Sequence, residues 1–164
     1  MLSAHADEIG LLVTRITESG RIQAIERGGI IPATYPGQKV QILTGKGIVY
    51  GAVEGYRELY KKNDLKAADL LIDIGATSKE EAARYVALGD TIVPDTGMRE
   101  LINGRITARA LDDRIGVFII MEALRRAQEK GCSAGVYAAA TVGEETTKNG
   151  AYWASTRIQP TLAI

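Results

Sequence analysis

The clearest structural signal in this chain is Ala138-Ala139-Ala140-Thr141-Val142-Gly143-Glu144-Glu145. It predicts a buried apolar strand that ends at a glycine and is followed at once by two adjacent carboxylates. Two ionised carboxylates side by side repel each other, so they need protons or cations for compensation. At the C-terminal edge of an α/β sheet, where ligands commonly bind, a metal ion or a substrate supplies that compensation. From this segment alone, a solvated turn carrying two glutamates is the alternative.

The segments around this strand alternate between helix and strand. A long helix is predicted over residues 113–130, with Gly131 at its C-terminal cap, and a second helix over residues 147–158. The first half of the long helix is apolar nearly all round, so it should be buried against a sheet. Together these elements predict an α/β fold class. The accompanying strands are predicted at residues 1–4, 104–108 and 161–164.

Residues 9–97 show a different pattern, because short strands there are separated by glycine and proline turns. Such spacing predicts a small barrel or sandwich. Residues 54–66 are predicted to form a loop, and Ser78 with Glu81 predicts a capping box that opens a short helix ending near Gly89. The chain thus divides into an α/β domain, residues 1–8 with 98–164, and an inserted domain, residues 9–97. The predicted strands of the insert are 9–16, 21–25, 39–43, 47–51, 69–75 and 91–93.

Composition and charge argue against several classes of protein. The 20 basic residues balance 20 acidic ones, so there is neither the basic patch that nucleic-acid binding needs nor a polybasic membrane anchor. No apolar run approaches the roughly 20 residues that cross a bilayer, and the N-terminus does not resemble a signal peptide. A single cysteine, Cys132, rules out an internal disulfide framework and indicates a reducing compartment, so we expect a cytoplasmic protein.

Two further segments carry residue types found at metal sites. His5, the only histidine, and Asp7 alternate on a predicted strand, so both side chains share one face. A carboxylate near a metal-binding imidazole fixes the tautomer of the ring, although a lone histidine is also common as a structural residue. Asp112 and Asp113 stand at the start of the long helix, where one aspartate serves as an N-cap and the second needs another explanation.

His5, Asp112 and Glu145 together are an imidazole and two carboxylates at strand ends, a ligand set that suits zinc or a related ion. Glu144 lies beside a ligand, where a metallohydrolase needs a general base. We expect Arg114 to pair with a neighbouring carboxylate. Because several acidic groups are crowded together, the pKa of at least one carboxyl should be raised.

One family resembles this chain in three motifs, in the same order: Ser3-Ala4-His5-Ala6-Asp7-Glu8-Ile9-Gly10, Ala110-Leu111-Asp112-Asp113-Arg114-Ile115-Gly116 and Thr141-Val142-Gly143-Glu144-Glu145. It is the glutamyl-aminopeptidase or tetrahedral (TET) aminopeptidase family of dimetal exopeptidases, some of whose members carry a cellulase label. Residues 71–82 also resemble its inserted domain. The resemblance implies a zinc-peptidase-like mixed sheet with flanking helices, interrupted by a small β-barrel that mediates dimer contacts. It also implies peptide substrates and homo-oligomers up to a dodecamer.

The resemblance further implies a role for each candidate residue. His5 would ligate one of two divalent metal ions, zinc or cobalt, Glu145 would ligate the other, and Asp112 would bridge both. Glu144 would be the general base, and Asp7 would orient His5.

The chain also departs from the family. Family members are longer and supply one more carboxylate ligand and a distant histidine ligand after the second helix. Gly143 stands where the family usually has glutamine, and the resemblance implies a cis peptide bond between Asp112 and Asp113. We therefore expect a metal-dependent aminopeptidase of which this chain is a truncated and inactive part.

Two other functions are compatible with the sequence. One is a non-catalytic oligomerisation module, in which the barrel and the half-sheet serve assembly contacts. The other is a cellulase-type glycosidase that uses two carboxylates. Glu144 and Glu145 are expected to point to opposite faces of a strand, which makes them a poor pair to flank a sugar bond.

Overall fold

The computed structural model describes all residues, Met1–Ile164, and the chain separates into two compact units. Unit 1 comprises Met1–Glu8 and Met98–Ile164, and unit 2 comprises Ile9–Gly97. The fold is mixed α/β, with flanking helices in unit 1 and a closed barrel in unit 2. The predicted fold class is confirmed.

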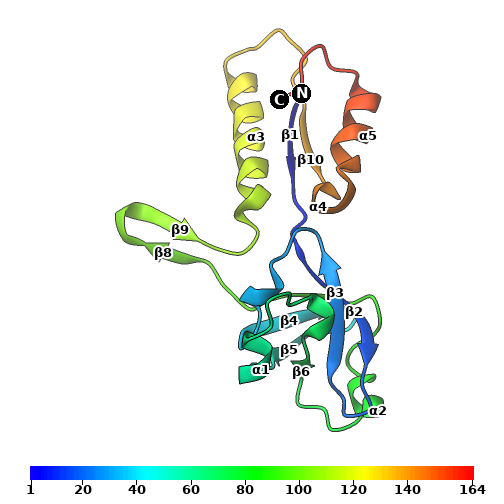
Figure 1. Cartoon of the computed structure of the whole chain (residues 1–164). Helices are drawn as coiled ribbons and strands as arrows, with labels where there is room; N and C mark the ends of the chain where they lie inside the picture. Colours follow the sequence, from blue (N-terminus) through cyan, green and yellow to red (C-terminus); the bar gives the residue numbers. More distant parts are fainter. The chain divides into compact units, whose positions relative to one another are not determined.

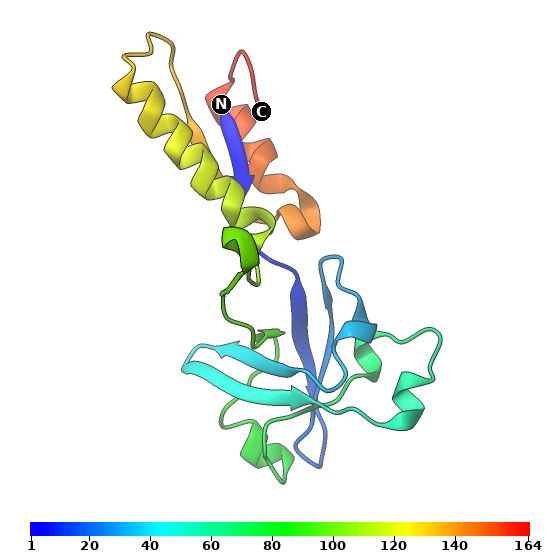
Figure 2. The same ribbon diagram turned by 90° about the vertical axis from the view of Figure 1, so that its left-hand side faces the viewer.

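Unit 1 is built on two parallel strands. Strand β1 (Leu2–His5) pairs with β10 (Ala138–Thr141) in a register that sets His5 opposite Thr141. Helices α3 (Leu111–Glu129) and α5 (Asn149–Ile158) flank this pair of strands (Figures 1 and 2). Because the strands are parallel, both end at the same edge, and the short helix α4 (Glu144–Thr147) begins beside that edge.

The long helix was predicted to within two residues at each end, but its burial was not predicted correctly. Regular helix begins after Asp113, because Asp112 and Asp113 have non-helical dihedral angles. Ile120 is the buried residue of α3, whereas Phe118 is 65% exposed. The expectation that the first half is buried is therefore wrong, since two strands are too narrow to cover more than one side of a helix. The exposed apolar residues of this half are Ile115, Phe118, Ile119 and Met121.

Two strand predictions in unit 1 need correction. Residues 161–164 form no strand, although Ile164 exchanges backbone hydrogen bonds with Met1 and Ser3 on the free side of β1. The strand expected at 104–108 is β9 (Arg105–Thr107), and it belongs to a hairpin with β8 (Arg99–Leu101). The hairpin turns at Asn103-Gly104, both with positive φ, a dipeptide that suits such turns.

Unit 2 is a closed barrel in the strand order β2-β3-β6-β5-β4-β7. Closure leaves no free sheet edge. Alternate side chains fill the interior, and residues such as Leu11, Ile42 and Ile92 are fully buried. The six strands are β2 (Gly10–Ile16), β3 (Ile22–Arg27), β4 (Lys39–Thr44), β5 (Gly47–Val53), β6 (Ile72–Asp73) and β7 (Thr91–Pro94).

The connections of unit 2 contain short helices that periodicity did not reveal. Helix α1 (Arg57–Tyr60) lies in the predicted loop, and β6 is shorter than expected because Ala67–Asp69 forms a 3₁₀ turn before it. A second 3₁₀ turn spans Pro32–Thr34. No helix of the chain is long and apolar enough to cross a membrane.

Helix α2 (Lys79–Ala82) begins at Ser78, as predicted. The Ser78 Oγ accepts a hydrogen bond from the Glu81 backbone N–H at 3.2 Å. The Glu81 carboxylate accepts from the backbone N–H and the hydroxyl of Thr77, each at 2.8 Å, so the reciprocal bond of a capping box goes to the residue before the N-cap.

Candidate metal centre

The candidate site lies at the common edge where β1 and β10 end. His5 is the last residue of β1 and is buried. After Thr141 ends β10, Gly143 turns the chain with φ +82°, a conformation that favours glycine, and α4 begins with Glu144 and Glu145. The two glutamates therefore lie in the first turn of a helix. The expectation that they point to opposite faces of a strand is wrong.

The His5 ring is held in one tautomer by its own strand. Nδ1 donates to the backbone carbonyl of Asp7 at 3.2 Å, which leaves the Nε2 lone pair available in the neutral ring. Nε2 lies 3.1 Å from Oδ1 of Asp112 and 3.8 Å from Oε2 of Glu144. A metal-binding histidine needs one ring nitrogen that donates to a backbone carbonyl and a second that faces the other ligands, and the His5 ring has both.

Asp7 connects the histidine to the two glutamates. Its carboxylate lies 3.6 Å from Nδ1 of His5 and is largely buried. The two carboxylate oxygens accept the backbone N–H groups of Glu144 and Glu145, each at 3.4 Å. The same side chain therefore lies beside the ring and caps the first turn of α4, where a negative charge is stabilising.

The adjacent aspartates Asp112 and Asp113 have different roles. The Oδ1 of Asp113 accepts from the backbone N–H of Gly116 at 3.0 Å, which makes Asp113 the cap of the regular part of α3. Asp112 does not cap the helix, and its carboxylate faces His5. The peptide bond between the two is cis, as the resemblance predicted.

Four of the predicted residues converge on one place. His5, Glu144 and Glu145 each offer a ligand atom, and these atoms lie within 4.8 Å of one another. Asp112 joins them through its 3.1 Å contact with His5. A nitrogen with several carboxylate oxygens is a donor set that suits zinc and related divalent ions.

The site is electrostatically crowded. Burial is the largest cause that raises the pKa of Glu145; His5 lowers it, and Asp112, Glu144 and Asp7 raise it further. This meets the expectation of a raised carboxyl pKa. Burial also lowers the pKa of His5, but its bond to the Asp7 carbonyl and the carboxylates of Asp112, Asp7 and Glu144 outweigh burial, so that pKa is raised overall.

Glu8 and Arg109 lie beside the site, and neither was predicted to do so. Glu8 is largely buried and forms ion pairs with Arg109 at 2.9 Å and with Arg114 at 3.3 Å. Arg114 also donates from Nε to the backbone carbonyl of Ala6 at 3.1 Å. Glu8 is the expected carboxylate partner of Arg114. Glu8 lies in the same motif as His5, which is a sequence signal for its place beside the site, whereas nothing in the sequence distinguishes Arg109.

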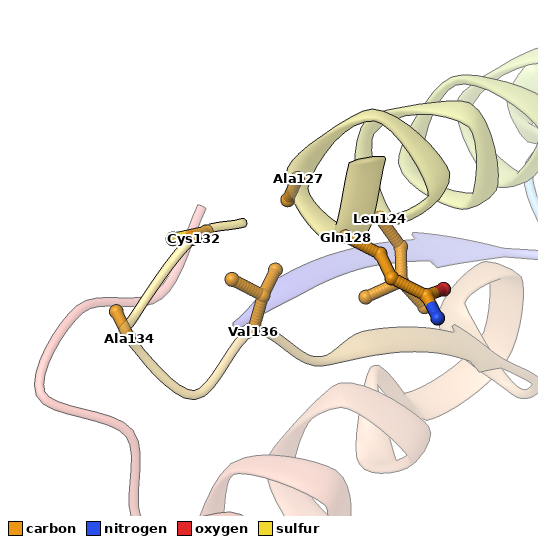
Figure 3. A pocket seen from close by; sticks show the side chains of 6 residues that line it. All are labelled: Leu124, Ala127, Gln128, Cys132, Ala134 and Val136. Carbon is orange, nitrogen blue, oxygen red and sulfur yellow. The ribbon is translucent and has the colours of Figure 1, made fainter. Parts of the chain in front are cut away.

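Unit 1 also contains a pocket that lies away from the candidate site. It has a volume of about 300 Å³ and lies between the C-terminal end of α3 and the segment that leads to β10 (Figure 3). Leu124 on its wall is 12 residues from Asp112, about 18 Å along a helix. The lining offers no carboxylate or imidazole, so the pocket is separate from the candidate site. Its lining residues are Leu124, Ala127, Gln128, Cys132, Ala134 and Val136.

Comparisons with known proteins match essentially the whole chain. The chain is 33% identical over 175 residues to the lysyl aminopeptidase of Pyrococcus furiosus, covering 100% of this chain and 49% of that protein. The TET aminopeptidase of a Thaumarchaeota archaeon superposes with a TM-score of 0.89 at 37% identity, over 99% of this chain and 48% of that one. The TET1 peptidase of Pyrococcus horikoshii, which can assemble into a tetrahedron or a large octahedral shell, gives 0.87 at 35% identity, over 99% and 50%.

The chain spans about half the length of the curated relatives it matches. The family described as M42 glutamyl aminopeptidase matches residues 1–164, the whole of this chain. The chain therefore belongs to the M42 glutamyl aminopeptidase family.

Proposed function

We propose that His5, Asp112, Glu144 and Glu145 form the centre of a metal-dependent aminopeptidase that removes N-terminal residues from peptides. The observation that carries the proposal is the convergence of His5, Glu144 and Glu145, whose ligand atoms lie within 4.8 Å of one another. Family membership and relatives named as lysyl and glutamyl aminopeptidases support peptides as the substrate class.

We expect this donor set to hold two divalent ions, zinc or cobalt. His5 would hold one ion, Glu145 the other, and Asp112 would lie between them. When bound, such ions supply Lewis acidity, which lowers the pKa of a water molecule and polarises a peptide carbonyl.

The chain's own residues supply proton transfer and positioning. Glu144 is 38% exposed and lies 3.8 Å from Nε2 of His5, so its carboxylate can take a proton from the attacking water and pass it to the leaving amine. Asp7 holds the His5 ring from one side and the backbone of both glutamates from the other. Glu144→Gln keeps the shape of the side chain but removes the proton acceptor.

The 164-residue chain alone is expected to bind metal weakly and to show no measurable turnover. One ion would have His5 and Asp112 as protein ligands, and the other would have Asp112 and Glu145. Catalytic zinc sites use three protein ligands. The distant histidine ligand implied by the family resemblance is not supplied by these residues, since His5 is the only histidine.

Assembly is the second part of the proposal. Two similar solved structures are described as a dodecamer and as a peptidase that can assemble into a tetrahedron or a large octahedral shell. We infer that this chain associates with copies of itself, with the barrel of unit 2 as a dimer contact. A non-catalytic assembly module is the competing function. A cytoplasmic location is supported by the free thiol of Cys132.

The experiment measures zinc and cobalt binding by calorimetry, together with cleavage of aminoacyl-nitroanilides and of soluble cellulose. We expect weak binding that His5→Ala abolishes and that the distant variant Glu129→Gln leaves unchanged. Failure to bind at millimolar metal, with the fold intact, would favour the assembly module. Tight binding of two ions with rapid peptide turnover would contradict the expected inactivity of this chain. Cleavage of soluble cellulose would instead identify a glycosidase.

A further inference from the structure

The position of Asp112 depends on how its loop is held. Its side chain is 89% exposed and contacts His5 at a single oxygen, so neighbouring side chains do not fix it. The loop itself is irregular, because Ala110 has φ +59° and both Asp112 and Asp113 have non-helical dihedral angles. The Asp113 cap fixes the helix that follows the loop. The residues that lead to Asp112 need another contact to hold them in place.

Glu8 supplies contacts on both sides of that loop. Its Oε2 accepts from Nε of Arg109, three residues before Asp112, at 2.9 Å. Its Oε1 accepts from the guanidinium of Arg114, two residues after Asp112, at 3.3 Å. Glu8 is only 13% exposed and Arg109 23%, so their ion pair is better shielded from solvent than a surface pair, whereas Arg114 is 52% exposed.

Arg114 adds a contact to the histidine strand. Its Nε donates to the carbonyl of Ala6, the residue after His5, while its terminal nitrogen binds Glu8. This two-point contact uses the planar fork of arginine, which lysine lacks. The loop that carries Asp112 is therefore connected to the backbone next to His5 as well as to Glu8.

We propose that Glu8, Arg109 and Arg114, here termed the Glu8 clamp, are positioning residues that hold Asp112 beside His5 for shared metal binding. The inference rests on the proposed metal site. Outer residues that orient ligands commonly change metal affinity by about 10–100-fold when they are replaced. If the Glu8 clamp served only the stability of unit 1, its loss would lower stability without changing the surroundings of the His5 ring.

The test uses His5 as a probe, because it is the only histidine in the chain. Ring ¹H–¹⁵N NMR spectra of the metal-free 164-residue chain are compared at one fixed pH for the wild type, Asp112→Asn, Glu8→Gln and Arg114→Gln. We expect the Glu8 and Arg114 variants to move the ring signals in the same direction as Asp112→Asn. The matched control is Arg125→Gln, which removes an ion pair with Glu122 elsewhere on α3 and should leave the ring signals unchanged.

A zinc titration of the same samples gives the second readout, and we expect Glu8→Gln to weaken binding about 10–100-fold. If the Glu8→Gln protein is folded and its ring signals match those of the wild type, the proposed positioning role of the Glu8 clamp is refuted, whatever the result of the zinc titration. A wild type that ignores zinc would refute the metal site, and the metal-free spectra would still decide whether Glu8 positions Asp112. If Glu8→Gln fails to fold, Arg109→Gln, which removes the ion pair between Arg109 and Glu8, is judged by the same spectra.

Discussion

At the scale of single residues, Gly116 and Asp113 fix where α3 begins. The backbone N–H of Gly116 donates to Oδ1 of Asp113, and a Cβ at Gly116 would collide with that carboxylate. We predict that Gly116→Ala displaces the Asp113 side chain and removes the cap, at a cost of about 0.5–2 kcal/mol in the free energy of unfolding. Chemical denaturation measures the difference.

The matched control for this variant is Gly135→Ala in the same unit. The nearest atom to a Cβ there is a Tyr137 ring carbon at 3.6 Å, an ordinary contact. If Gly116→Ala were as stable as Gly135→Ala, the contact between Asp113 and Gly116 would not determine the start of α3.

Residue types could be predicted from the sequence better than residue pairings. His5, Asp112, Glu144 and Glu145 were predicted as site residues from their chemistry and from the family resemblance, and the structure brings them close together. The division of roles between Asp112 and Asp113 could not be predicted, because it depends on loop dihedral angles that adjacent identical residues do not encode. The same holds for Arg114 and Glu8, since an ion pair across 106 positions depends on how β1 meets α3.

At the scale of elements, the second half of α3 carries a compact group of charges. Glu122 accepts from Arg125 at both oxygens and from Arg126 at 2.8 Å. Hydrogen bonds from Arg125 first, then from Arg126, lower the pKa of Glu122 from 4.5 to about 2. Because the folded pKa lies below the unfolded one, this stabilisation is present above pH 4.5 and is lost as the pH falls towards about 2.

We predict that the carboxyl carbon of Glu122 titrates near pH 2 in an NMR titration of the folded chain. The double variant Arg125→Gln with Arg126→Gln should restore a midpoint close to the ordinary 4.5, because both donors are removed. An ordinary midpoint in the unaltered chain would show that the arginines do not hold this carboxylate in solution.

Helices and strands were predicted well where the hydrophobic periodicity was strong. The predictions failed where tertiary contacts determine the local structure or its burial. The barrel strands and α3 followed from alternation and from end signals. The short helix α1 and the 3₁₀ turn at Ala67–Asp69 could not be predicted, because segments of three or four residues contain no full period. The exposed face of α3 could not be predicted either, since the pattern records an apolar surface but not what covers it.

At the scale of the whole molecule, the apolar face of α3 predicts self-association of this chain. Phe118 and Ile119 are 65% and 58% exposed, which is unusual for large apolar side chains that lie together on one helix. We expect Phe118→Gln to shift sedimentation velocity profiles towards the monomer. The control Leu162→Gln, at a residue 66% exposed that lies outside both α3 and the barrel, should not. A monomeric wild type at micromolar concentration would refute this role of the α3 face.

The central claim is that the ends of β1 and β10 form a divalent metal site. The most direct measurement is an anomalous difference map, at the zinc absorption edge, of a crystal of this chain soaked in zinc. We predict a peak within coordination distance, about 2.0–2.2 Å, of Nε2 of His5 and of a carboxylate oxygen of Asp112, Glu144 or Glu145. A map in which zinc occupies other sites while this one stays empty would contradict the claim.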